Sequence, residues 1–158
     1  MKSLSKYLLK RLRKLRWWQQ ALLGACIPLV ALNGAVAFFG SSLVFPLSPF
    51  FVKEKCHALL AYAKHRPRCL LVGHEAFGPL TDAAERKHGL PRGLMRAVVA
   101  VESGSQAHRI SFAGAMGPAQ LMPGTAALLG VTDPFDPEQA IDAGARYLSH
   151  HLKRMGRV

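Results

Sequence analysis

The stretch AVVAVESGSQAHRISFAGAMGPAQLMPGTA, residues 97–126, decides the fold of this chain. It begins with an apolar run, Ala97 to Val101, whose side chains follow helical spacing. Glu102 ends that run, and apolar surroundings would favour the neutral form of its carboxyl group, as a general acid at neutral pH requires. The segment therefore predicts a helix over 91–102 that presents one candidate acid, followed by a glycine-containing loop.

Helical signals continue on both sides of this stretch. Upstream, Asp82 precedes Glu85 by three residues, which is typical of a helix start, and Gly89 is expected to end that helix. Residues 70–80 hold glycine and proline and are expected to be irregular. Convincing strand alternation is absent, so the fold class predicted for residues 81–158 is all-α.

Downstream, short helices are expected near 118–121 and 124–129. Asp136, Pro137 and Gln139 then form a capping pattern for a last helix over about 137–154. Asp133 and Asp136 are accordingly interpreted as helix caps, so a second catalytic acid is not assigned.

The first third of the chain has a different composition. Seven of the 21 basic residues fall in the first 16 positions, and the formal net charge of the whole chain is +12. No charged residue occurs from Trp17 to Val52, whereas about 20 apolar residues suffice to cross a bilayer. We expect a basic cytoplasmic tail at 1–18, an uncleaved transmembrane anchor at 19–45, and a linker with a short helix at 46–80.

The same segment has two alternative interpretations. Ala35-Val36-Ala37 has the form of a signal-peptide cleavage site, but the apolar character continues beyond it. A basic tail could also hold nucleic acid or anionic lipid, yet the apolar run that follows favours a membrane, and no nucleic acid partner is expected.

The three cysteines allow few conclusions. Cys26 lies within the apolar run and is expected to be a small buried residue. Cys56 and Cys69 fall on the expected outer side, where an oxidising compartment would permit a disulfide, but two free thiols are equally consistent. Neither their spacing nor that of the nearby histidines is typical of a zinc site, so no metal and no cofactor are expected.

The region from about residue 80 to 155 resembles the lytic transglycosylases with the goose-type lysozyme fold. The resemblance is carried by a Glu-Ser pair, an S-x-x-G-x-x-G-x-x-Q spacing and a trailing G-A-x-Y-L. The matching segments are Val99–Ser103, Ser111–Ala126, Asp136–Ile141 and Ala143–Leu148.

This resemblance implies an enzyme that cleaves peptidoglycan glycan strands between N-acetylmuramic acid and N-acetylglucosamine. Glu102 would protonate the glycosidic oxygen and then act as base toward the muramoyl 6-hydroxyl, which closes a 1,6-anhydro ring without water. One acid would suffice because the substrate's acetamido group stabilises the transition state. The resemblance also implies the following substrate-binding residues: Ser103, Ser111, Gly117, Gln120 and Tyr147.

These residues have physical tasks as well. Gly114 and Gly117 would let the backbone turn tightly and approach a bulky sugar, although a plain turn would explain them too. The Gln120 amide can both donate to and accept from sugar groups. Packing in the core would explain Tyr147 equally well.

The chain departs from the family in two places. Family members commonly have Gly-Leu-Met-Gln where this chain has Gly117-Pro118-Ala119-Gln120. They also continue into an Ala-Tyr-Asn-Ala-Gly motif, whereas this chain ends at Val158, so the lysozyme-like domain is expected to be incomplete.

The sequence is therefore consistent with three functions. The first is an active transglycosylase anchored in the bacterial inner membrane, with its N-terminus cytoplasmic and its catalytic domain periplasmic. The second is an inactive glycan-binding or scaffold protein, and the third is a membrane protein whose tail binds an anionic surface. A hydrolytic lysozyme is the alternative within the enzyme class. Peptidoglycan and the lipid bilayer are the expected partners, and a cell-wall or secretion apparatus is a further candidate.

Overall fold

The computed structural model describes residues 16–40, 45–65 and 74–156. The expected basic tail at 1–18 therefore lies almost wholly outside the described residues, as does Cys69. The described parts contain helices and two isolated β-bridges but no strand, so the all-α prediction is confirmed.

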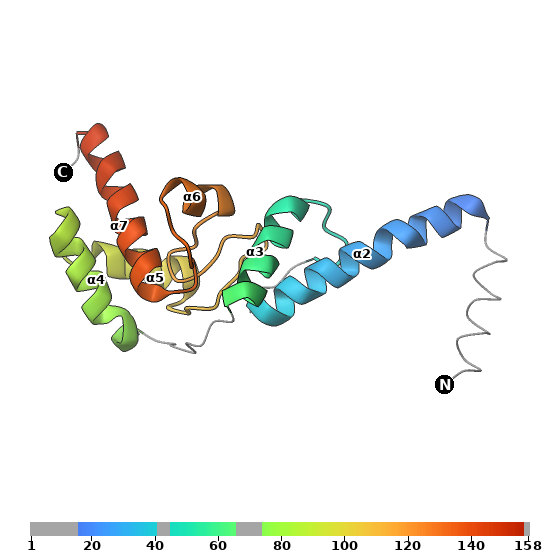
Figure 1. The fold of residues 1–158 in the computed structure, drawn as a ribbon, viewed down its shortest axis with the longest axis horizontal. Coiled ribbons are helices and arrows are strands. Elements are labelled where there is room, and N and C mark those ends of the chain that lie inside the picture. Colours follow the sequence, from blue (N-terminus) through green and yellow to red (C-terminus); the bar gives the residue numbers. More distant parts are fainter. Residues whose placement is uncertain (1–15, 41–44, 66–73, 157–158) are drawn as a thin grey trace.

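The molecule is elongated because one long helix extends away from a group of shorter ones (Figure 1). This helix, α2 (Trp17–Gly40), contains no charged residue and holds Pro28 in its interior. In the described part of the chain it is the one helix long and apolar enough to cross a membrane, and only 11% of its most apolar window is buried.

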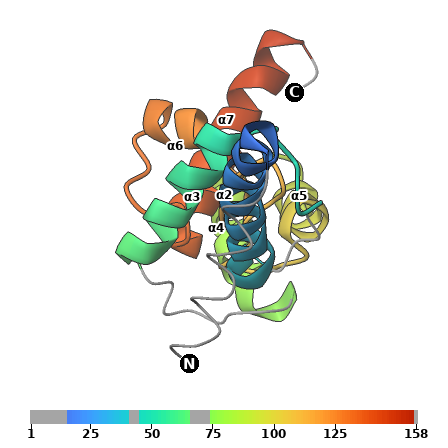
Figure 2. The same cartoon turned by 90° about the vertical axis from the view of Figure 1, so that its right-hand side faces the viewer.

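Helix α3 (Val52–His65) lies beside α2, as the two views in Figures 1 and 2 agree. A buried polar contact joins them, because the Lys55 Nζ donates to the Asn33 Oδ1 at 2.6 Å. The same Asn33 uses its Nδ2 to donate to the backbone oxygens of Pro46 and Ser48. The short helix predicted within 46–80 is thus present as α3, and it packs against α2 as part of the fold.

The remaining helices are α4 (His74–His88), α5 (Leu94–Ser103), α6 (Pro123–Leu128) and α7 (Pro137–Arg154). Helix α4 packs against both α5 and α7, and α5 also touches α7. Helix α3 touches α6, so it stands between α2 and the rest of the molecule (Figure 1).

Two clusters of buried apolar side chains form the core. The first joins α2, α3, the loop after α5, α6 and α7, and it contains Val36, Ala58, Ile110, Met116, Leu121, Ala126, Phe135 and Ala143. The second joins α4, α5 and α7, and it contains Phe77, Ala84, Leu90, Met95, Val99, Ala107, Ile141 and Ala145. Because Val36 belongs to the first cluster and is fully buried, the last turns of α2 are part of the folded body.

The expected starts of two helices, and the short helix expected near 118–121, were wrong. Helix α4 begins at His74 and includes Pro79, where irregular structure was expected for 70–80. Burial of Phe77 in the second cluster outweighs the loss of one backbone donor at a proline. Helix α5 begins at Leu94, three residues after the expected start, and residues 118–121 form a turn instead of a helix. The ends expected at Gly89 and Gly104 and the span of α7 are confirmed.

Glu85 has a role that differs from the one expected. It lies late in α4 and is buried, and its carboxylate accepts hydrogen bonds from the backbone N–H groups of Gly93 at 2.8 Å and Met95 at 2.7 Å. A third, longer bond comes from the Arg96 N–H at 3.3 Å. An anion is favourable at a helix N-terminus, so Glu85 of α4 fixes the start of α5.

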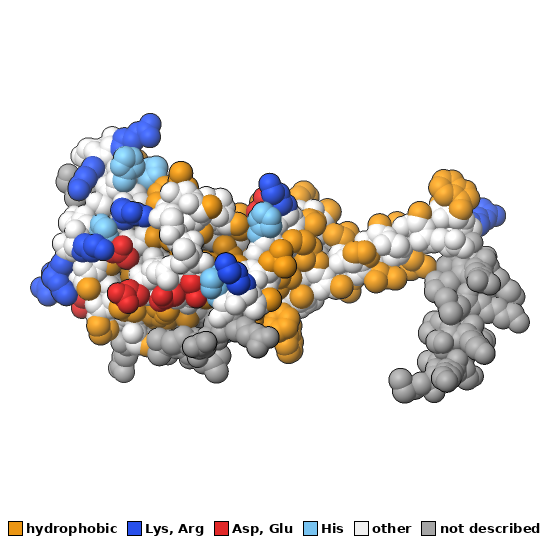
Figure 3. Space-filling model, viewed as in Figure 1, with side chains coloured by type: hydrophobic (Ala, Val, Ile, Leu, Met, Phe, Trp, Pro, Cys, Tyr) orange, Lys and Arg blue, Asp and Glu red, His pale blue; other side chains and the backbone are white. Residues whose placement is uncertain are grey.

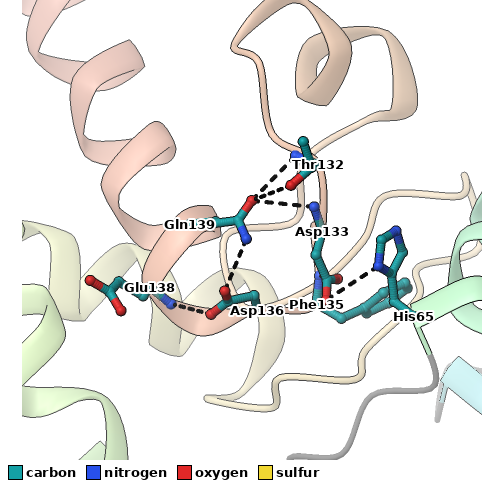
Figure 4. A network of polar contacts seen from close by, with 7 residues as sticks. All are labelled: His65, Thr132, Asp133, Phe135, Asp136, Glu138 and Gln139. Carbon is teal, nitrogen blue, oxygen red and sulfur yellow. Dashed lines mark hydrogen bonds and ion pairs between the residues drawn. The ribbon is translucent and has the colours of Figure 1, made fainter.

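A polar network holds the turn before α7 (Figure 4). The Asp136 Oδ1 accepts from the Glu138 N–H at 3.0 Å, as expected of a cap, and the Gln139 Nε2 donates to the Asp136 Oδ2 at 3.0 Å. Asp133 accepts from the Phe135 N–H and faces His65 of α3 at 3.5 Å. Asp136 is therefore the N-cap of α7, as predicted, whereas Asp133 caps no helix and instead holds the preceding turn.

A second polar contact joins α4 to α7. The Asp142 carboxylate accepts from Lys87 and contacts His88, each at 2.8 Å. Partial burial raises the pKa of Asp142, but the hydrogen bonds from its two basic neighbours outweigh burial and hold that pKa below its usual range.

Candidate active site

Helix α5 presents two different faces. Met95, Val99 and Ser103, spaced four residues apart, are buried against the core. Val98 and Glu102 are also four residues apart, and both line a groove on the adjacent face of the helix, which Met95 also reaches. One face of the apolar run therefore packs against the core, and the adjacent face lines the groove.

The groove has a volume of about 400 Å³ and lies between α5, α6, α7 and the loop before α6. Most of its lining is apolar, with a few polar groups, as is usual for a ligand site. Its lining residues are Met95, Val98, Glu102, Ala119, Gln120, Leu121, Met122, Thr125, Gly144, Tyr147, Leu148 and His151.

Glu102 lies in the groove but is exposed. The expectation that apolar surroundings enclose this carboxyl group is therefore wrong for the unliganded protein. The reason is its position in the last turn of α5, where the preceding Val101 is also 84% exposed. Among the described residues that line this groove, Glu102 is the one carboxylate.

Gln120 shares the groove with Glu102, and its side chain is fixed. The amide Nε2 donates to the Gly117 carbonyl at 2.8 Å and to the Arg109 carbonyl at 3.2 Å. Two carbonyl acceptors require the NH₂ group at this position, so the amide orientation is determined and the Oε1 is left as the acceptor. The Gln120 backbone is left-handed, with φ of 47°, which is uncommon for a residue with a side chain.

The two glycines of the loop make close contacts with protein and not with an open groove. Gly117 has φ of 72°, and a Cβ there would lie 1.8 Å from the Pro134 carbonyl oxygen. Gly114 has φ of 87°, and a Cβ would lie 2.6 Å from the carbonyl carbon of Glu54 in α3. Other backbone segments of the chain occupy the space that a side chain would need, so tight turns and close packing explain both glycines, and their approach to a sugar stays a prediction.

The two predicted serines hold the loop and do not line the groove. Ser103 is completely buried, its Oγ donates to the Val99 carbonyl at 2.9 Å, and the same Oγ accepts from the Gln106 N–H. The Ser111 Oγ accepts from the Ala113 and Ala115 N–H groups at 3.3 and 3.0 Å. Ser103 is wrong as a direct substrate contact, and Ser111 supports the turn that contains Gly114.

Tyr147 lines the groove and is 41% exposed, so it is not a core residue, and its contact with substrate stays a prediction. Its ring stands edge to face with His151 one turn later, with 4.3 Å between the ring centroids. His151, Thr125 and Met122 were not predicted from the sequence. The four-residue spacing from Tyr147 to His151 was the available signal for the histidine, because residues at that spacing share one face of a helix.

No metal site is evident in the parts of the chain that the structure describes, where no three His, Cys, Asp or Glu side chains gather closely enough to hold an ion. Cys26 and Cys56 are free thiols. Pairing of Cys56 with Cys69 stays a prediction, since Cys69 lies outside the described residues.

Comparison with known proteins matches residues 79–158 to the family described as the transglycosylase SLT domain. The chain is 45% identical over 76 residues to the "Transglycosylase" of Enterobacteria phage PRD1. The aligned region covers 48% of this chain and 29% of that protein. It is 41% identical over 73 residues to the "Membrane-bound lytic murein transglycosylase F" of Desulfosudis oleivorans, covering 46% of this chain and 16% of that protein.

The chain thus spans less than a third of the length of these relatives. No solved structure matches significantly.

Proposed function

Because this chain belongs to the SLT transglycosylase family, we propose that it cleaves the glycosidic bond between N-acetylmuramic acid and N-acetylglucosamine in peptidoglycan. The observation that supports this most is the groove itself. It combines one carboxylate, Glu102, with a fixed amide, Gln120, and a largely apolar lining.

In this proposal Glu102 donates its proton to the glycosidic oxygen as the bond to the muramoyl C1 breaks. The resulting carboxylate then removes the proton of the muramoyl 6-hydroxyl, whose oxygen bonds to C1 and closes a 1,6-anhydro ring. The proton returns to Glu102, so no water is consumed. Hydrolases of the usual kind need two carboxylates across the bond, whereas the described residues that line this groove include one, which is the number that the ring-closing route requires.

Substrate would supply the enclosure that the free groove lacks. A sugar lying across Val98 and Leu148 would exclude water from Glu102, and an apolar neighbourhood disfavours the charged form of a carboxyl group. The Gln120 Oε1 would accept a hydrogen bond from a sugar hydroxyl or acetamido N–H. Tyr147 would offer its exposed ring as a surface for a sugar.

We also propose that α2 anchors the protein in the bacterial inner membrane, with the basic N-terminus cytoplasmic and the groove periplasmic. The length and apolar surface of α2 support a span, and the charge asymmetry of the sequence supports the orientation. A cell-wall or secretion apparatus would then be a neighbour of the groove.

The test is release of soluble fragments from purified sacculi by the full chain and by Glu102→Gln. Glu138→Gln is the matched control, because Glu138 is an exposed glutamate on α7 whose carboxylate lies outside the groove. We expect anhydro-ended fragments from the parent and the control, and none from Glu102→Gln.

Other outcomes would contradict the proposal in distinguishable ways. Fragments with reducing ends would identify a hydrolytic lysozyme. Protein that pellets with sacculi but releases nothing would identify a glycan-binding or scaffold protein. Equal release by Glu102→Gln and the parent would exclude Glu102 as the acid.

A further inference from the structure

The connector between α2 and α3 exposes large apolar side chains. Phe45 and Phe50 are 71% and 69% exposed, and Leu47 and Phe51 are 42% and 45% exposed. The Phe51 ring faces Phe112 of the glycine loop at a centroid distance of 6.1 Å, and Phe112 is 57% exposed. These five residues are called the connector surface below. Water is an unfavourable neighbour for such a cluster, so it calls for an apolar partner.

The position of α2 suggests which partner covers it. A span cannot begin much before Trp17, because Arg16 and the basic residues before it would enter the hydrocarbon. From Trp17 to Asn33 the helix rises about 24 Å, which is less than the roughly 30 Å of a bilayer core. On the exposed side of α2 the hydrocarbon would therefore extend past Asn33, while Val36 and Gly40 on the other side pack against the rest of the chain.

The connector lies beside α2 at this level. The Asn33 Nδ2 donates to the carbonyls of Pro46 at 3.0 Å and Ser48 at 3.1 Å. Hydrocarbon that surrounds α2 beyond Asn33 would therefore surround the connector as well.

The connector backbone is suited to a medium without water. The prolines at 46 and 49 have no N–H group, and the Ser48 N–H donates to the Phe45 carbonyl at 3.0 Å. Asn33 satisfies two of the carbonyls, and its own Oδ1 accepts from the buried Lys55. Backbone polar groups in a bilayer need partners within the protein, and the Ser48 N–H and the carbonyls of Phe45, Pro46 and Ser48 have them.

The distribution of charged residues along the chain agrees with this placement of the hydrocarbon. No charged residue occurs from Trp17 to Val52, and Lys53 and Glu54 at the start of α3 are the first charges after the connector. Apolar side chains cover most of the exposed surface of α2, whereas charged and histidine side chains lie over α3 and toward the far end of the molecule (Figure 3).

We propose that the connector surface is seated in the outer leaflet of the membrane that α2 crosses, with lipid acyl chains as its partner. The proposal rests on the membrane anchoring proposed above. Because Phe112 belongs to the loop that carries Gly117 and Gln120, the groove is held at a fixed, short height above the lipid. The enzyme would then act on glycan strands next to the membrane.

The test uses tryptophan fluorescence of the full chain in phosphatidylcholine vesicles, with and without brominated acyl chains that quench nearby indoles. Phe45→Trp and Phe50→Trp are made separately in a chain that carries Trp17→Phe and Trp18→Phe. Leu128→Trp in α6 is the matched control, because Leu128 is 80% exposed but lies away from the connector. Circular dichroism confirms the helical content of each variant.

We expect bromine to remove most of the fluorescence of the Phe45→Trp and Phe50→Trp variants and to leave that of Leu128→Trp unchanged. The unsubstituted chain, whose Trp17 and Trp18 lie at the start of α2, reports on anchoring. If bromine quenches that chain but neither connector variant, the anchor stands and the seated connector is overturned. If bromine quenches none of them, both fail. Protection by a second copy of the chain would appear as cross-links between connector variants without quenching, and would also overturn the proposal.

Discussion

Replacement of Glu85 should show that a residue outside the groove holds the helix that presents Glu102. Two acids lie three residues apart on α4 and differ in their surroundings. Glu85 is 3% exposed and accepts from three backbone N–H groups at the start of α5. Asp82 is exposed and pairs with the equally exposed Arg96 at 2.8 Å. They form a matched pair for Glu85→Gln and Asp82→Asn.

The expected loss follows from these contacts. Glutamine retains one acceptor oxygen, which can still serve the Met95 N–H, but its NH₂ group would face the Gly93 N–H donor. Loss of one buried hydrogen bond to a charged acceptor costs about 1.5–3 kcal/mol. We therefore expect Glu85→Gln to lower the free energy of unfolding by about 2–3 kcal/mol. An exposed ion pair contributes about 1 kcal/mol or less, so Asp82→Asn should cost no more than that.

Urea unfolding of the full chain in detergent micelles, followed by far-ultraviolet circular dichroism, measures both values. Amide hydrogen exchange gives a local readout, because the Met95 and Arg96 N–H groups should exchange faster in Glu85→Gln than in Asp82→Asn. Equal losses of stability in the two variants, or unchanged exchange at these amides, would refute the assignment of Glu85 as the cap of α5.

Three further predictions concern other contacts of the fold. Gly117→Ala should lower stability by about 2–5 kcal/mol, because the added methyl group would collide with a backbone carbonyl and the backbone at this position is left-handed. The control Gly124→Ala adds a methyl group in open space and should stay within about 1 kcal/mol of the parent. Thermal unfolding compares the two variants. Asp142→Asn should lower the free energy of unfolding at neutral pH. The difference in stability between parent and variant should vanish as the pH falls through the depressed pKa of the Asp142 carboxyl group, because the unfolded state then no longer binds more protons than the folded state. A stability difference that grows in acid would contradict this prediction. Lys55→Met should lower the free energy of unfolding by about 1–3 kcal/mol, because it leaves the buried Asn33 amide oxygen without its donor. Lys53→Met on the exposed side of α3 should change stability by less than about 0.5 kcal/mol. Similar losses for the two variants in urea unfolding would count against the buried contact.

Much of the local structure was predictable from neighbouring residues. The run before Glu102 predicted a helix, Asp136 and Pro137 predicted the start of α7, and the uncharged run after Trp17 predicted the long apolar helix. These features depend on periodicity, capping and composition, which act over a few residues along the chain.

The assignment of faces was not predictable in this way. Helical spacing showed that α5 has an apolar face, but only packing decided that Val99 faces the core and that Glu102 is exposed in the groove. Pro79 lies inside α4 because burial of Phe77 outweighs a local preference. His151 lines the groove together with residues of α5 because α7 packs against α5 in the folded chain.

The sequence by itself determined that this chain has an apolar N-terminal helix, a helical domain and a helix that carries Glu102 near its end, because each of these depends on residues close together in the chain. Only the tertiary structure decided that Gly114 is packed against α3, that Gly117 is packed against Pro134 and that Asn33 binds Lys55. Those contacts join residues distant in sequence, and their energies come from burial and exclusion of water, which exist only once the helices have packed together.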